Sequence, residues 1–326
     1  NDRADNDRNG NHPVAVFHSF FLPALCFRIS GTVLRLPIAP FWTSSVEAAV
    51  WNIRLPRVIL SVLVGACLAA AGGAYQGVFQ NPMASPDILG ASAGAGFGAA
   101  LAILLGASSM AITIGAFAAS LLTVALVFTV SRHAKGDRVL GLVLAGIMIS
   151  SLFQSGTSFL KLVADPNNQL PQITYWLMGS LSGAKWADIG FVLIPMLCGL
   201  IPLYLLRWRL NVITMGDDEA RAMGVDPRKI RLWISVASTL VTASAVSVSG
   251  MIGWVGLVIP HIMRRLVGSD YRFLMPGSML GGGIFLLIVD NVARNAAGIP
   301  IGILTAFIGA PFFLWLITGK GDHYAH

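Results

Sequence analysis

The sequence predicts an all-α integral membrane protein with about ten transmembrane helices, and three observations support this fold class. Hydrophobic residues fill 55% of the 326 positions and charged residues only 11%, whereas soluble domains carry about 25% charged residues. Apolar windows of roughly 20 residues, the length needed to cross a bilayer as a helix, recur along nearly the whole chain. The net charge of +7 is spread between these windows, which indicates membrane topology and not a nucleic-acid interface.

Apolar windows and helix-breaking residues place the spans in order. We expect helices near 14–34, 55–80, 90–106, 111–131, 138–163, 188–207, 230–249, 272–294 and 300–318. Two shorter pieces remain, 171–183 and 253–268, and a Pro-His pair interrupts the second. A half-length segment in a membrane must be covered by protein or face a water-filled cavity. Counting the second piece as a short span gives ten.

The ends of the chain are expected to be polar tails, 1–13 and 321–326, on either side of a single transmembrane domain, 14–320. Pro23, Arg28 and the lack of a small-residue cleavage site favour a retained first helix over a signal peptide.

Basic residues predict the orientation of the ten spans. Fifteen of the 22 lysines and arginines lie in the tails or in loops on the side of the N-terminus. The positive-inside rule therefore predicts that both termini are cytoplasmic.

The longest polar interruption, 209–231, lies on the predicted cytoplasmic side. Asp217, Asp218 and Glu219 precede Arg221, an order that favours a helix N-terminus, and Gly224 can close that helix. We expect two short helices split at Gly224 and Pro227. The pattern alone is compatible with a solvated loop or with a docking element for a cytoplasmic partner.

Motifs for nucleotide binding and metal binding are missing. The chain has no GxxxxGK[ST] or HExxH, and its three cysteines lie singly in apolar segments. We therefore expect no catalytic residue and no metal site. Gly94 to Ala99 match a loose GxGxxA, but the acidic residue that this fingerprint needs about 20 positions later is missing, so close helix packing explains these glycines better.

Two polar features inside the apolar sequence stand out. In the stretch FQNPMASPDILGASAGAG, Pro82 and Pro86 forbid helix continuation, and Asp87 is expected to cap the next helix. Asp290 and Arg294 stand one helical turn apart and are expected to pair, either for function or as a simple interfacial anchor.

Three long stretches, 54–96, 250–272 and 300–317, resemble the FecCD family, the permease subunits of type II ABC importers for cobalamin, haem and ferric siderophores. The resemblance implies ten helices per subunit and a homodimer around a central path. It also implies two ATP-binding cassette subunits, which bind ATP and Mg²⁺, and an extracytoplasmic binding protein. The chain itself would bind no cofactor and would lie in the bacterial inner membrane.

The resemblance also implies roles for particular residues. The matching coupling segment toward the ATPase consists of Met215, Gly216, Asp217, Asp218, Glu219, Ala220, Arg221, Ala222, Met223, Gly224 and Val225. The residues that match the family's docking sites for the binding protein are Arg54, Arg57 and Arg294. The cytoplasmic gate falls to Asn81, Met83, Val139 and Leu140, of which the last pair is small and hydroxylated in the cobalamin permease but apolar here.

The function these features predict is ATP-driven import, with a ferric siderophore or haem as the preferred cargo and cobalamin or molybdate and tungstate as alternatives. A secondary transporter working alone would need a membrane-embedded acid, and Asp290 is the only candidate that the sequence suggests. A membrane enzyme is disfavoured because no nucleophile or metal constellation is present.

Overall fold

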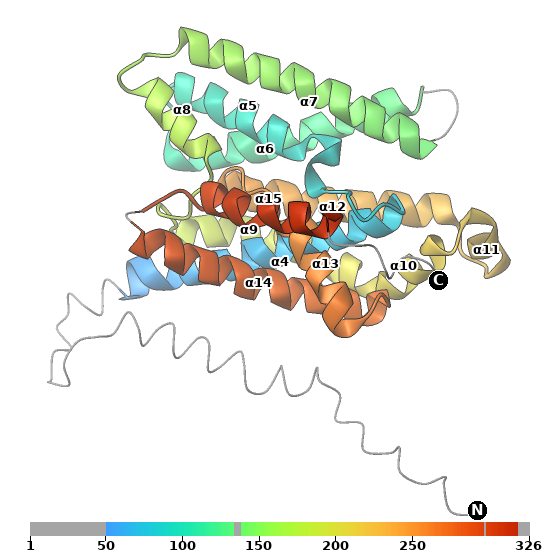
Figure 1. Ribbon diagram of the computed structural model, residues 1–326. Helices are drawn as coiled ribbons and strands as arrows, with labels where there is room; N and C mark the ends of the chain where they lie inside the picture. Colours follow the sequence, from blue (N-terminus) through green and yellow to red (C-terminus); the bar gives the residue numbers. More distant parts are fainter. Residues whose placement is uncertain (1–49, 134–137, 297, 319–326) are drawn as a thin grey trace, which may run out of the picture. The chain divides into compact units, whose positions relative to one another are not determined.

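Twelve α-helices and no strand make up the described residues of this computed structural model, which are 50–133, 138–296 and 298–318 (Figure 1). The prediction of an all-α protein is confirmed. The predicted first span, 14–34, and both polar tails lie outside the described residues.

Six of the described helices are long and apolar enough to cross a membrane. They are α4 (Leu55–Val78), α6 (Ser109–Ser131), α7 (Arg138–Val163), α9 (Trp186–Leu205), α12 (Pro227–Ser249) and α14 (Tyr271–Asn295). Three shorter helices, α5 (Ala91–Leu104), α13 (Val255–Val267) and α15 (Ile301–Thr318), match the remaining predicted spans. The connecting elements are η2 (Val50–Arg54), η3 (Pro86–Leu89), α8 (Gln169–Leu177), α10 (Arg207–Thr214) and α11 (Asp217–Ala222).

These helices pack in two groups (Figure 1). The larger group surrounds α4, which contacts α9, α10, α12, α13 and α14. The second group contains α5, α6, α7 and α8, and α12 joins the groups because it also packs against α5 and α6. In the larger group, α4 is therefore the central helix.

Glycines let α4 approach its neighbours closely. A Cβ atom at Gly65 would collide with the carbonyl oxygen of Gly282 in α14, and one at Gly72 would collide with that of Gly256 in α13. In a bilayer, helices gain little from burying apolar side chains against one another, so close backbone packing through small residues holds them together. The predicted packing role of Gly94 is also confirmed, because a Cβ there would collide with Thr123 of α6.

The Pro-His pair does not interrupt its helix, contrary to the prediction. Helix α13 runs continuously through Pro260. A proline removes the hydrogen bond to the carbonyl four residues earlier, which here belongs to Gly256. The amide of Gln76 in α4 donates to this carbonyl oxygen over 3.4 Å. A side chain from the central helix thus satisfies the backbone group that the proline leaves free.

Two further local predictions were wrong. Asp87 does not cap α5, because Gly90, with a left-handed φ of 76°, occupies the N-cap position. The two short helices in this region are α10 and α11, separated at Met215 and Gly216, and Pro227 starts the long helix α12. Gly216 has a φ of 128°, which allows the sharp turn between α10 and α11.

Replacing Gly72 by alanine is expected to lower the apparent Tm of the purified protein, because overpacking against rigid backbone costs about 1–3 kcal/mol. The matched control is Gly190→Ala in α9, where an added Cβ meets no atom within 4 Å. The control should keep or slightly raise the Tm, since alanine favours a helix by up to about 1 kcal/mol. Equal Tm values for the two variants would contradict the packing role of Gly72.

Candidate functional site

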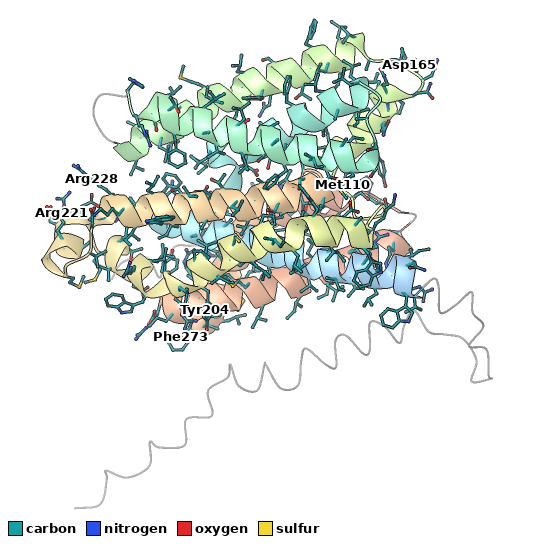
Figure 2. The ribbon with its side chains drawn as sticks, turned by 180° about the vertical axis from the view of Figure 1, so that it is seen from behind. Met110, Asp165, Tyr204, Arg221, Arg228 and Phe273 are labelled. Atoms are coloured by element: carbon teal, nitrogen blue, oxygen red, sulfur yellow. The ribbon has the colours of Figure 1, made fainter. Side chains whose placement is uncertain are left out.

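The candidate site residues lie at the two ends of the helix bundle and around a cavity between them. Figure 2 shows Asp165 at one end and Arg221 and Arg228 at the other. Helix α11, which carries Arg221, marks what we call the coupling end. The first turn of α4 and the last turn of α14 lie at the opposite end, which we call the arginine end (Figure 1).

At the arginine end, a buried ion pair joins α4 to α14. The Asp290 carboxylate, with a side chain only 1% exposed, lies 2.8 Å from Nη2 of Arg57. Arg57 also donates from Nε to both carboxylate oxygens, over 2.9 and 3.0 Å. Since the Arg57 side chain is itself only 15% exposed, much of this pair is removed from water.

Arg294 shares the same carboxylate more loosely. Its Nε lies 3.8 Å from Oδ2 of Asp290, and its Nη2 donates to the side-chain oxygen of Asn291. The predicted pairing of Asp290 with Arg294 is therefore confirmed, but Arg57 is the closer partner. Arg54 ends η2, is half-buried, and has no ion pair within the described ranges.

At the coupling end, the coupling segment (Met215 to Val225) is exposed on one side and anchored on the other. Met215 and Met223 are 62% and 46% exposed, while Ala220 is fully buried. Asp217 pairs with Arg231 of α12 at 2.7 Å. Asp218 pairs with Arg221, three residues later in the same helix, and this pair is exposed to solvent. The segment thus presents an exposed surface while remaining fixed to α12.

Helix α10 ties this end to two further helices. Gln80, in the turn after α4, donates to the carbonyl of Ile213 over 2.8 Å. Asn211 donates to Asp270 over 2.6 Å and accepts from the backbone N–H of Tyr271. The hydrogen bond from the Arg272 side chain lowers the pKa of Asp270 to about 2, so this carboxylate stays ionised at cellular pH.

The residues predicted for the gate lie in two places near the coupling end. Asn81 and Met83 form the turn after α4, where the Asn81 side chain accepts a hydrogen bond from the Met83 N–H over 2.8 Å. Val139 and Leu140 lie in the first turn of α7. Met83 and Leu140 are both exposed. Their role as a gate stays a prediction.

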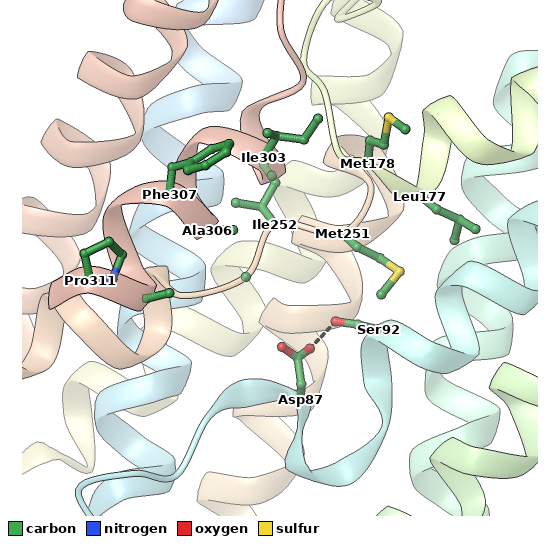
Figure 3. A pocket seen from close by; sticks show the side chains of 13 residues that line it. Asp87, Ser92, Leu177, Met178, Met251, Ile252, Ile303, Ala306, Phe307 and Pro311 are labelled. Atoms are coloured by element: carbon green, nitrogen blue, oxygen red, sulfur yellow. Dashed lines mark hydrogen bonds between the residues drawn. The ribbon is translucent and has the colours of Figure 1, made fainter. Parts of the chain in front are cut away.

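Between the two ends lies a cavity of about 680 Å³, and Figure 3 shows its lining. Its walls come from α8, α15 and the segment before α13, and its polar side chains are those of Asp87 and Ser92. The Ser92 hydroxyl donates to the Asp87 carboxylate. Sequence reasoning missed this position of Asp87 because it assigned the residue to a helix cap. An acid followed by a long run without any basic residue was the available signal.

Histidine, cysteine, aspartate and glutamate do not gather into any group of three or more that could hold a metal ion within the described residues.

Replacing Asp290 by asparagine is expected to destabilise the protein by about 3 kcal/mol, because Arg57 would keep a largely buried charge without its partner. Thermal or denaturant unfolding of the purified protein measures the effect. Asp218→Asn, which breaks an exposed pair, is the control and should change stability by less than about 1 kcal/mol. Similar losses of unfolding free energy in both variants would show that burial of the ion pair between Asp290 and Arg57 does not raise its contribution to stability.

Comparison with known proteins identifies the family of this chain. A family model described as the FecCD transport family matches residues 14–319. The hemin transport permease HmuU of Yersinia pestis is 40% identical over 89% of this chain and 90% of its own length. The molybdate import permease MolB of Haemophilus influenzae is 42% identical over 82% of this chain and 80% of its own length.

A third relative is the cobalamin import permease BtuC of Halobacterium salinarum, 42% identical over 84% of this chain and 74% of its own length. Among solved structures, an ABC transporter of metal-chelate type in an inward-facing conformation superposes with a TM-score of 0.85 at 37% identity. The superposition covers 94% of this chain and 99% of the chain in that structure. The family match, spanning nearly the whole sequence, shows that the chain is a multi-pass membrane protein of the FecCD transport family.

Proposed function

We propose that this chain is the permease subunit of an ATP-driven importer, which receives cargo from an extracytoplasmic binding protein and passes it to the cytoplasm by alternating access. The observation that carries this proposal is the separation of two surfaces on one bundle. Three partly buried arginines, Arg54, Arg57 and Arg294, stand at one end, and the partly exposed but anchored coupling segment stands at the other. The family membership and the named functions of the relatives support the same assignment.

In this proposal the coupling segment contacts a separate ATPase subunit in the cytoplasm. Motion of that subunit would reach α4, α12 and α14 through the anchors of α10 and α11, since each anchor is an ion pair or a short hydrogen bond. ATP and Mg²⁺ would bind to the partner, and this chain would supply no chemistry and bind no cofactor. Both termini would face the cytoplasm of a bacterial cell, with the protein in the inner membrane.

The proposed assembly is a homodimer with two ATPase subunits. Helix α7 supports a second copy, because only 11% of its most apolar window is buried within the chain, against 72% for α4. Its exposed apolar side chains include those of Leu144, Met148 and Leu152. We place α7 against the partner subunit and the cargo path, beside the gate residues that it carries.

The cargo we propose is an iron complex, either a ferric siderophore or haem. The relative named for hemin supports this choice, while those named for cobalamin and molybdate keep these two as alternatives. Asp290, the acid that the sequence suggests for ion coupling in a transporter without ATP, is not available for that role, because two arginines share its carboxylate.

The decisive experiment is uptake by proteoliposomes that contain this chain with its ATPase subunit. Accumulation of the ligand that co-purifies with the binding protein should require both that protein and internal ATP. Uptake that persists without ATP, or that follows an ion gradient instead, would contradict the proposal.

Arg54→Glu is expected to weaken stimulation of the ATPase by the binding protein at least about tenfold, because charges at the rim of an interface steer encounter and fix orientation. We change Arg54 and not Arg57, because a change at Arg57 would also break the buried ion pair with Asp290 and so affect stability. Lys161→Glu, an equal charge change at the outer end of α7, is the control and should leave stimulation intact. Unchanged stimulation in Arg54→Glu would remove this residue from the docking surface.

A further inference from the structure

The cavity contains one acidic side chain in an otherwise apolar wall. Its lining residues are leucine, isoleucine, methionine, glycine, alanine, phenylalanine and proline, apart from Asp87 and Ser92. Figure 3 shows the Asp87 carboxylate directed toward the space below α15, with the Ser92 hydroxyl beside it. The cavity therefore has one strong hydrogen-bond acceptor and no basic side chain.

Local structure holds Asp87 firmly in this position. Pro86 and Leu89 of the same short helix, η3, are buried, and Pro86 packs so closely on α13 that a Cβ at Gly256 would lie 2.6 Å from its ring. Gly90 then turns the chain into α5 with a left-handed φ of 76°. The Asp87 side chain is nevertheless exposed, and the space to which it is exposed is the cavity.

No ion pair involves Asp87 in the part of the chain that the structure describes, where its hydrogen-bond partner is the neutral hydroxyl of Ser92. The contrast with Asp290 is clear, because that carboxylate lies against two arginines. An acid in a membrane protein that faces a cavity without a cationic partner is a candidate for contact with a transported charge.

The position of this acid links it to the cargo path. Asp87 lies on the same short connection, between α4 and α5, as Asn81 and Met83 of the predicted gate. A fixed charge between apolar walls produces a stronger potential than one in bulk water, because the low-dielectric walls focus the field. Here that potential would attract cations and repel anions.

We propose that Asp87 is a specificity-determining residue, whose carboxylate makes the cavity favour cationic or cation-containing complexes over oxyanions such as molybdate. This inference rests on the proposed import function only in placing the cavity on the cargo path. Among the alternatives for the cargo, it favours a metal complex that presents positive charge or hydrogen-bond donors.

The potential can be measured without any cargo by thiol labelling of the full chain in lipid nanodiscs. Cys26 and Cys198 are replaced by serine and Cys67 by alanine, and Ala306→Cys in the cavity wall serves as the reporter. Its reaction rates with a trimethylammonium-ethyl and a sulfonato-ethyl methanethiosulfonate are compared, each relative to the rate with free cysteine.

The expected result is a cationic-to-anionic rate ratio that falls about tenfold or more in Asp87→Asn, since one unit charge then no longer acts on the approaching reagent. Asp87→Glu should retain the ratio, which separates loss of charge from misfolding. Asp218→Asn, an equal loss of charge at a side chain 92% exposed at the coupling end, should also retain it.

An identical ratio in Asp87→Asn and the parent protein would overturn the proposal, as would a reporter that neither reagent reaches. The assay uses neither ATP nor partner proteins. A failure of ATP-dependent uptake would therefore contradict the import function without changing this ratio. Normal ATP-dependent uptake together with an unchanged ratio in Asp87→Asn would contradict only the role of Asp87.

Discussion

Close backbone packing around α4 is the constraint on which the rest of this structure depends. A bilayer supplies no water to satisfy free backbone groups and little hydrophobic drive between helices. The chain meets both demands on one helix. Gly65 and Gly72 admit the backbones of α14 and α13, and Gln76 donates to the carbonyl that Pro260 leaves free. A short and proline-containing helix is thereby stable beside a long one.

The same helix connects the two ends of the bundle. In its first turn, Arg57 pairs with Asp290 of α14, and in the turn after its last residue Gln80 bonds to α10. Forces applied to the coupling segment therefore have a direct mechanical route to the arginine end. The ion pair contributes to this route only as an intact unit, because desolvation makes a buried charge without its partner costly.

Most helix positions could be predicted from the sequence, since long apolar windows and their glycine and proline boundaries are local signals. The predicted span 138–163 coincides with α7, for example. The pairing of Arg57 with Asp290 could not be predicted, because 233 positions separate the two residues. Helix α13 was expected to break at Pro260 because the compensating Gln76 lies on another helix. Asp87 was misread because only tertiary structure shows that it faces a cavity.

In the proposed importer, the coupling segment and the arginine end face opposite sides of the membrane. Single cysteines in the cysteine-free protein test this arrangement most directly, one at Asp218→Cys in α11 and one at Asn167→Cys in the loop after α7. In intact cells, a membrane-impermeant maleimide should label only Asn167→Cys, and Asp218→Cys should react only after the membrane is opened. Labelling of Asp218→Cys from outside intact cells would contradict the account.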